Sequence, residues 1–356
     1  MPHPHAIVDV VSRIDPPLQA PAATVLNATP GGLTIRFASG QTARLDPADP
    51  QSVAWAEILD DLRKLHAPVY VEVDPRTGAI TRLLIPLTVT VSAVHPTAAG
   101  DVEAELEISH ARHVVRQTNP DFKQIVAALQ AAQRQGTPVI VTETEDDHEI
   151  IDVRSAPPAV GPALAPTTGP PTVNLALQAV TPQRAQQLFD LVSLKSCHPV
   201  TVPPPCIPFR YPDDGCWARA HEMCRLILGD GEEPAKVWIY GTLQVQTRNH
   251  PNCYVCWKWH VAPTLNVTEG GVTRLYVLDP ALFAEPVLEA IWKGVQGDPA
   301  ATLAHTDATP FYRSSTGVIQ TDPTYTQTNQ ALAYYRAKLK LRSTGSKGPP
   351  PYAKCP

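Results

Sequence analysis

A cysteine stands where a helix is expected to begin. The stretch YPDDGCWARAHEMCRLIL places two aspartates and a glycine before Cys216, and an amphipathic run follows at once. Asp213 or Asp214 is expected to cap the helix, so that Cys216 lies in its first turn. Unpaired backbone N–H groups and the positive end of the helix dipole favour an anion there, which predicts a lowered pKa for the thiol. The same N–H groups could bind an oxyanion formed on a substrate carbonyl.

A hairpin further along the chain supplies a candidate base. The tetrapeptide TEGG is a turn signal, and a two-residue loop at Glu269 and Gly270 would place His260 directly opposite Asp279. Directly opposed residues have Cβ atoms about 5 Å apart, so the carboxylate could orient an imidazole whose other nitrogen faces the thiol. A loop centred on the glycine pair would make the two residues diagonal but keep them on one face. Together with Cys216 they predict a triad of nucleophile, base and orienting acid.

The alternative for His260 is a core histidine in a strand. His250, Cys253, Cys256 and His260 also have spacings that could form a zinc site. A second CxxC pair, which would strengthen that interpretation, is missing, and zinc would occupy the only well-placed base. We therefore expect a disulfide within the CxxC motif or from it to another cysteine, and neither a metal nor a cofactor.

The remaining chemical candidates are expected to be structural. His221 lies on the helix beyond the nucleophile and is interpreted as a packing residue. Trp217, Trp257 and Trp259 are expected in the core, although Trp217 and Trp259 could also line a substrate cleft beside the nucleophile.

Composition limits the class of protein. The 356 residues suggest about two domains. The 39 prolines are roughly twice the usual share, so long loops are expected. A net charge of -5 and a pI near 6.2 offer no basic surface for nucleic acid or an acidic membrane. No apolar run reaches the ~18 residues of a membrane span, and the N-terminus does not have the pattern of a signal peptide.

All seven cysteines follow residue 196, which suggests a disulfide framework confined to one domain. Six of them can pair, leaving one reactive thiol, and Cys355 could fix the C-terminal coil. Two alternatives are open: reduced thiols in a cytosolic core, or a disulfide that joins Cys216 to Cys206 or Cys224.

A proline-rich stretch divides the chain. Residues 155–172 read SAPPAVGPALAPTTGPPT and are expected to form a semi-rigid linker between residues 1–154 and residues 173–356. The first part is interpreted as duplicated with an offset of 70 residues, because residues 49–85 and 119–154 share one pattern. Each copy predicts a helix of about 14 residues followed by two strands and preceded by one, a β-α-β-β unit. No nucleophile with a base, metal cluster or phosphate loop is evident there, so a non-catalytic α+β module is expected; chance similarity is the alternative.

The second part predicts a helix capped by Thr181 with Pro182 in its first turn. The Cys216 helix follows, then strands around AKVWIYGTLQVQT, CYVCWKWHVAPTLNV and VTRLYVLDPALF. Two more helices are expected, around 287–295 and 327–341.

These blocks resemble a known family. GCWARAHEM, a tryptophan-rich strand ending in WHV, and VLDPALF are similar, in order and spacing, to the protein-glutaminase (protein glutamine deamidase) family. The resemblance spans roughly residues 180–355. It implies an α+β catalytic domain with a papain- or transglutaminase-like core and an antiparallel sheet, and it maps the family's catalytic residues onto Cys216, His260 and Asp279.

The resemblance also implies a biological setting. Family members carry an N-terminal pro-region that covers the cleft until a protease removes it, so residues 1–154 are expected to be inhibitory. The expected enzyme is a secreted bacterial monomer that hydrolyses the side-chain amide of protein-bound glutamine and releases ammonia. Its partners would be protein substrates with exposed glutamine, its own pro-region and an activating protease. A transglutaminase, a cysteine protease and a disulfide-stapled binding module are the alternatives.

Overall fold

The computed structural model describes residues 6–156, 178–198, 201–202 and 204–356. The chain forms two compact units, each a mixture of helices and antiparallel sheets, so the expected α+β class is confirmed. The N-terminal unit comprises 1–107, 112–159 and 340–349, and the C-terminal unit comprises 108–111, 160–339 and 350–356. The segment Ile108–Ala111 thus belongs to the C-terminal unit, although its sequence neighbours belong to the other.

The N-terminal unit contains a five-stranded antiparallel sheet in the order β3-β2-β1-β4-β5, with helix α2 against it. Its elements are β1 (Ala6–Asp15), α1 (Ala22–Asn27), β2 (Leu33–Phe37), β3 (Thr42–Leu45), α2 (Ser52–Lys64), β4 (Pro68–Val73) and β5 (Ile80–Leu84). The helix buries its apolar stripe, which includes Trp55 and Leu59, and this face makes it amphipathic.

Two three-stranded sheets complete the N-terminal unit, in the orders β11-β10-β6 and β7-β8-β9. Their elements are β6 (Leu87–Val89), β7 (Val91–Pro96), β8 (Val102–Leu106), β9 (His113–Val115), α3 (Phe122–Gln135), β10 (Val139–Glu143) and β11 (Ile150–Ser155). Helix α3 ends at Gly136, whose left-handed backbone (φ 62°) suits glycine at a helix C-terminus. Val141 and Leu129 lie in the small core between these elements.

Each half of the expected duplication has the predicted helix and the two strands after it. The structure adds β3 before α2 and β9 before α3, strands too short to give a clear sequence pattern. The duplication itself stays an interpretation. Of the expected linker, residues 157–172 lie outside the described residues, and Ser155 ends strand β11.

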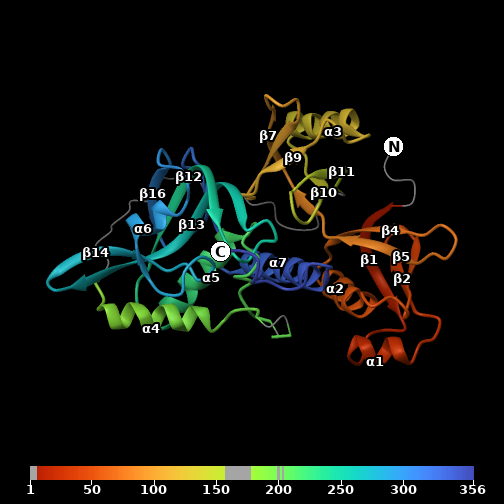
Figure 1. The fold of residues 1–356 in the computed structure, drawn as a ribbon, viewed down its shortest axis with the longest axis horizontal. Coiled ribbons are helices and arrows are strands. Elements are labelled where there is room, and N and C mark those ends of the chain that lie inside the picture. Colours follow the sequence, from red (N-terminus) through yellow and green to blue (C-terminus); the bar gives the residue numbers. More distant parts are fainter. Residues whose placement is uncertain (1–5, 157–177, 199–200, 203) are drawn as a thin grey trace. The chain divides into compact units, whose positions relative to one another are not determined.

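The C-terminal unit is built on a five-stranded antiparallel sheet in the order β15-β14-β13-β12-β16 (Figure 1). Its elements are α4 (Pro182–Ser193), α5 (Cys216–Gly229), β12 (Ala235–Gln246), β13 (Tyr254–Glu269), β14 (Val272–Val277), β15 (Val287–Leu288), α6 (Glu289–Gly294), β16 (Thr302–Asp307), β17 (Pro310–Arg313), β18 (Ile319–Thr321) and α7 (Thr326–Thr344). Helix α4 begins as expected, because the Thr181 side chain accepts a hydrogen bond from the N–H of Arg184 (3.2 Å). Strands β16 to β18 were not expected.

Helix α5 is buried along most of its length and packs against β13. A helix in this position must satisfy its polar groups internally, and Arg219 does so by donating to the carbonyl oxygens of Tyr211 (2.9 Å) and Asp214 (2.6 Å). The adjoining core includes Trp217, Trp238 and Trp259. Burial on both faces therefore fixes the start of α5 relative to the sheet.

The β13–β14 hairpin turns at Gly270 and Gly271, whose φ values are 58° and 80°. Two consecutive residues with positive φ are typical of a type I′ turn, which favours glycine at both positions. Glu269 pairs with Val272, so the loop is centred on the glycine pair. The expectation that His260 lies directly opposite Asp279 is therefore wrong, and the alternative register, shifted by two residues, is present.

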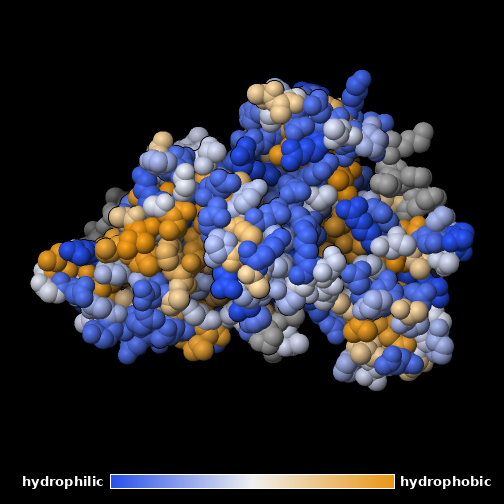
Figure 2. Space-filling model, in the orientation of Figure 1, coloured by the Kyte–Doolittle hydropathy of each residue, from blue (hydrophilic) through white to orange (hydrophobic). Residues whose placement is uncertain are grey.

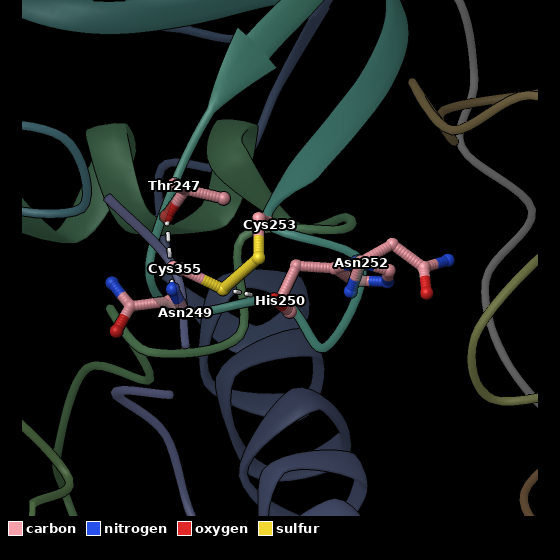
Figure 3. Close-up of a disulfide and its surroundings, with 6 residues drawn as sticks. All are labelled: Thr247, Asn249, His250, Asn252, Cys253 and Cys355. Carbon is pink, nitrogen blue, oxygen red and sulfur yellow. Dashed lines mark hydrogen bonds between the residues drawn. A yellow bond between two sulfur atoms is a disulfide. The ribbon is translucent and has the colours of Figure 1, made fainter. Parts of the chain in front are cut away.

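Two disulfides are formed, Cys197–Cys206 and Cys253–Cys355. The second fixes the C-terminal tail beside the loop that precedes β13, where Cys355 also contacts the carbonyl oxygen of His250 (Figure 3). Cys216, Cys224 and Cys256 are reduced. The expectation of up to six paired cysteines is thus wrong, as is the alternative of a disulfide at Cys216.

Among the described residues, no helix has both the length and the apolar character needed to cross a bilayer. Figure 2 shows hydrophobic residues gathered on the visible surface of the C-terminal unit, where Figure 1 places α6. Ile291 of α6 and Val295 just after this helix are exposed. Exposed apolar residues are common on folded proteins, and we assign them no role.

Candidate active site

Helix α5 begins at a glycine rather than at a capping aspartate. The N-cap residue is Gly215, with φ 80°, and no side chain caps the helix, so the expected cap at Asp213 or Asp214 is wrong. A Cβ atom on Gly215 would lie 2.4 Å from the ring of Tyr335. Both the positive φ angle and the close contact with Tyr335 therefore require glycine at this position, and Cys216 follows as the first helical residue.

The carboxylate of Asp214 binds neighbouring backbone and hydroxyl groups instead. Its Oδ1 accepts hydrogen bonds from the N–H of Gly215 (2.8 Å) and of His110 (3.3 Å), and its Oδ2 accepts one from the hydroxyl of Ser109 (2.7 Å). Asp214 therefore links the residue before Cys216 to the segment Ile108–Ala111.

His260 and Asp279 form a buried pair. The Nε2–H of His260 donates to Oδ2 of Asp279 at 2.8 Å, and the indole N–H of Trp292 donates to the same oxygen at 3.0 Å. The His260 ring stacks on Trp257, with ring centroids 4.5 Å apart and an interplanar angle of 20°. The imidazole is thus fixed by one acid and by aromatic rings, which leaves its Nδ1 to act on a neighbour.

That neighbour is Cys216. The Sγ atom of Cys216 and a ring nitrogen of His260 lie within 4.8 Å of each other, and both residues are 1% exposed. Because Nε2 of His260 carries the proton shared with Asp279, Nδ1 has the lone pair that a proton from the thiol requires. The structure therefore brings the three predicted site residues together, with His260 in the middle.

The pKa of the Cys216 thiol is raised well above its usual value because the thiol is buried; the charge of Arg219 acts in the opposite direction. The predicted lowering of this pKa is therefore wrong for the chain in this form. Burial removes the water that would solvate a thiolate, and this effect exceeds that of the helix start.

The pKa of Asp279 is lowered. Burial alone would raise it, but the charge and hydrogen bond of His260 and the hydrogen bond of Trp292 more than compensate. Asp279 therefore stays ionised and can stabilise an imidazolium at His260.

The segment Ile108–Ala111 lies beside this site within the C-terminal unit. The carbonyl oxygen of His110 accepts a hydrogen bond from the N–H of Lys258 (3.0 Å), and Ala111 forms an antiparallel bridge with Trp257. The Nδ1–H of His110 donates to the carbonyl oxygen of Trp259 (3.1 Å). The segment thus forms an isolated β-bridge to β13 and places the His110 ring 5.9 Å from the His260 ring, centroid to centroid.

Trp217 and Trp259 lie close to the site but are mostly buried. Trp217 packs edge-on against Phe311, with centroids 4.6 Å apart, and Trp259 packs against Tyr312. Both belong to the hydrophobic core, as expected. Their role in lining a substrate cleft stays a prediction.

The alternative zinc set is not assembled. Cys253 is in a disulfide, and the Nε2–H of His250 contacts Oδ1 of Asp213 (3.1 Å). His260 is engaged with Asp279, as described above. His250 and Cys253, which lie in the loop between β12 and β13, therefore have partners other than zinc.

His221 is buried, as expected of a packing residue. Its Nδ1 accepts a hydrogen bond from the Nζ of Lys236 (2.9 Å). Burial, together with the charge of Lys236, lowers the pKa of His221 to about 4. Burial also lowers the pKa of Lys236 to about 8.

The N-terminal unit holds a cluster that the sequence did not reveal. Nδ1 of His113 lies 2.7 Å from Oε2 of Glu143, and Nδ1 of His148 lies 3.1 Å from Oε1 of the same carboxylate. These residues could hold a metal ion by type and distance. The expectation of no metal cluster in this half is therefore wrong as a statement of geometry.

Two residues of the site escaped the sequence analysis. His110 comes from the other half of the sequence, and Trp292 lies 13 residues beyond Asp279. Ile108 has φ 70°, which is rare for a β-branched residue, and this kink in the covering segment leaves no mark in the sequence. A tryptophan on a short amphipathic helix gives no sign that its indole N–H is directed at a carboxylate.

Comparison with known proteins identifies similar chains. A family model described as glutaminase matches residues 185–296, a range that contains all three predicted catalytic residues. A crystal structure of a pro-protein-glutaminase is 24% identical over 77% of this chain and 99% of its own, with a TM-score of 0.53. This likeness shows a shared fold.

Two structures of protein-glutaminase each cover about half of this chain. A crystal structure of protein-glutaminase is 32% identical over 51% of this chain and 100% of its own, with a TM-score of 0.41. The protein-glutaminase of Chryseobacterium proteolyticum, solved by NMR, is 32% identical over 42% of this chain and 84% of its own, with a TM-score of 0.39. No curated protein gave a significant match.

Proposed function

This chain belongs to the protein-glutaminase family and is a hydrolase of amide C–N bonds, and we propose that it is the pro-form of an enzyme that converts protein-bound glutamine to glutamate and releases ammonia. The observation that carries the proposal is the contiguous set of Cys216, His260 and Asp279 within the range matched by the glutaminase model. A nucleophile, a base and a buried acid in this spatial arrangement perform acyl transfer on unrelated folds.

The proposed first step forms a thioester. The Sγ of Cys216 attacks the γ-carbonyl carbon of glutamine, and the thiol proton passes to Nδ1 of His260. The carbonyl oxygen becomes an oxyanion, for which the backbone N–H of Cys216 at the start of α5 is a donor. His260 then gives its proton to the nitrogen, the C–N bond breaks, and ammonia leaves.

The second step consumes water. His260 takes a proton from a water molecule, whose oxygen attacks the thioester carbon. The C–S bond breaks, the sulfur recovers the proton from His260, and glutamate is released. Asp279, ionised because its pKa is lowered, holds Nε2–H and stabilises the imidazolium in both steps.

We propose that residues 1–154 act as an inhibitory pro-region. The support is the position of Ile108–Ala111, which binds beside β13 through Lys258 and Trp257 and contacts Asp214 through Ser109. An extended substrate segment would use the same free edge by adding a strand. Removal of this segment by a protease that cuts within residues 155–172 would expose the thiol.

The two disulfides support action in an oxidising compartment, and we propose that the enzyme is secreted by a bacterium and works as a monomer on exposed glutamines of other proteins.

The test is an ammonia assay on a glutamine-rich protein, before and after limited proteolysis, with Cys216→Ser as the control. We expect the cleaved enzyme to release ammonia without crosslinking the substrate or cleaving its backbone. The Cys216→Ser variant should release no ammonia. Crosslinking would indicate a transglutaminase and new substrate termini a protease. Activity that survives in Cys216→Ser would remove the proposed nucleophile.

A further inference from the structure

Two histidines and a cysteine form a buried cluster where Ile108–Ala111 meets the proposed triad. One ligand atom each of His110, Cys216 and His260 lies within 4.8 Å of the other two, and all three side chains are buried. We propose that these side chains bind Zn²⁺ in the uncleaved chain, and that the ion holds the inhibitory segment on the nucleophile. This inference rests on the pro-region role proposed above.

The hydrogen bonds of both rings suit a metal. The carbonyl oxygen of Trp259 can only accept, so Nδ1 of His110 carries a proton, and Nε2, which lies 3.4 Å from Oδ1 of Asp214, is the ring nitrogen that would bind the metal in its unprotonated form. In His260 the acid Asp279 takes the Nε2–H, which leaves the lone pair on Nδ1. A zinc-binding histidine almost always donates its other N–H to a carbonyl or a carboxylate in this way.

Nδ1 of His260 is buried and makes no hydrogen bond in the described structure. A nitrogen in such a position loses its interaction with water and gains nothing in return, a cost that a bound cation would remove. A nearby thiol and a third nitrogen supply the rest of a soft ligand set. This observation does not depend on the position of His110 and so supports the site separately.

The ligand types and distances fit zinc. Thiolate and imidazole are its common protein ligands, and bonds of about 2.0–2.3 Å in a tetrahedron hold ligand atoms roughly 3.5 Å apart. The three atoms here lie within 4.8 Å, so small side-chain rotations would bring them to that separation. Three protein ligands leave a fourth position for water, as in open zinc sites.

The surrounding charges favour a cation. Oδ1 of Asp214 lies 3.4 Å from Nε2 of His110, and Asp279 lies behind His260. Zn²⁺ with one thiolate leaves a net charge of +1, and the two buried carboxylates compensate it. The positive charge of Arg219 also acts on the sulfur of Cys216 and opposes the binding of a cation.

Binding must release a proton. Zn²⁺ binds a thiolate and not a thiol, so the proton of the Cys216 thiol is released as the S–Zn bond forms. The proton leaves to solvent, and no redox step is involved. Departure of Ile108–Ala111 would remove one of the three ligands, so cleavage would weaken the site and free the nucleophile.

The test uses the intact chain with Co²⁺ and Zn²⁺ as probes. Co²⁺ bound to a thiolate gives a near-ultraviolet charge-transfer band, which reports a cysteine ligand directly. We expect this band in the wild type, its loss in Cys216→Ser, and its displacement by Zn²⁺. His110→Ala should weaken Zn²⁺ binding at least about tenfold, since even loss of a residue that only orients a metal ligand costs about 10–100-fold.

Two control variants identify the site. Cys224→Ser should keep the band, because Cys224 is outside the cluster. His113→Gln should also keep it, because the His113, Glu143 and His148 cluster contains no sulfur. Circular dichroism would confirm that each variant is folded.

The inference is overturned by any of three results: no band in the wild type, a band that survives in Cys216→Ser, or unchanged Zn²⁺ affinity in His110→Ala. Ammonia release by the cleaved, metal-free enzyme tests the proposed function separately. An active enzyme whose uncleaved form binds no zinc would disprove the metal site alone, and an inactive enzyme that binds zinc at Cys216 would disprove the function alone.

Discussion

Asp279 lies 2.8 Å from His260 although the hairpin register does not pair the two residues. Strand β14 ends at Val277, and the N–H of Leu278 still donates to the carbonyl oxygen of Pro263 (2.9 Å). Asp279 therefore lies just beyond the end of β14, close enough for its side chain to contact the imidazole. The position of the carboxylate is set by the chain leaving the sheet after Val277 and not by cross-strand pairing.

Asp279→Asn should preserve this geometry but reverse the hydrogen bond, because an amide can donate to Nε2 and favours the wrong imidazole tautomer. We expect turnover to fall by about 10⁴-fold, with KM little changed. The measurement is steady-state ammonia release by the cleaved enzyme. A rate within tenfold of wild type would remove Asp279 from the mechanism.

Trp292→Phe should lower kcat by about tenfold. The indole N–H donates to the same Asp279 oxygen as His260, and a hydrogen bond to a charged group contributes about 1.5–3 kcal/mol. We expect kcat to fall while KM changes little, because Trp292 acts through Asp279 and positions it. Trp238→Phe is the matched control, since its indole bonds Thr306 instead (3.0 Å) and it should keep kcat. Equal losses in the two variants would indicate a general packing effect.

The sequence predicts the three proposed catalytic residues but little of their surroundings. Cys216, His260 and Asp279 could be proposed because a helix start, a strand and a hairpin are local patterns, and the two-residue register error left His260 and Asp279 on one face. The covering segment was not recognisable, because Ile108–Ala111 reaches the site through long-range contacts. Its kink at Ile108 arises from tertiary structure, which overrides the local preference of an isoleucine.

The pairing of the cysteines could also be predicted only in part from the sequence. Their clustering predicted disulfides in one half, and two formed there. Spacing could not tell which thiols stay reduced, because pairing depends on Cα atoms that come within about 7 Å after folding. Likewise, Asp214 had the residue type and place of a helix cap, but Gly215 took that position because the ring of Tyr335 leaves no room for a side chain.

His221 should make the stability of the enzyme depend on pH in the acidic range. Its pKa is lowered to about 4 in the folded chain, from an ordinary value of 6.5, so the unfolded chain binds more protons between these values. The free energy of unfolding should therefore fall as the pH drops from 6.5 towards 4. This one group accounts for about 2 kcal/mol between pH 7 and pH 5.

The measurement is urea unfolding at pH 7 and pH 5. In His221→Gln the loss between these pH values should be smaller than in wild type, because Gln can still accept from Lys236 but cannot become a second cation beside it. His95→Gln, a change at an exposed histidine, should lose as much free energy of unfolding between pH 7 and pH 5 as the wild type does. An identical loss in all three proteins would mean that His221 does not titrate as its burial requires.

Cleavage of the linker should change the reactivity of one thiol. In the intact chain Cys216 is 1% exposed and its pKa is raised by burial, so both access and ionisation oppose alkylation. The tethered segment acts at an effective concentration that can reach millimolar, and a cut within residues 155–172 would remove this advantage. We expect iodoacetamide to label Cys216 slowly in the intact chain and rapidly in the separated C-terminal part, in parallel with ammonia release.

Peptide mapping by mass spectrometry would distinguish labelling of Cys216 from labelling of Cys224. The buried thiol of Cys224 also has a raised pKa, about 11, and should react slowly in both forms. Equal labelling of Cys216 before and after cleavage would show that the N-terminal part is an independent module and not an inhibitor.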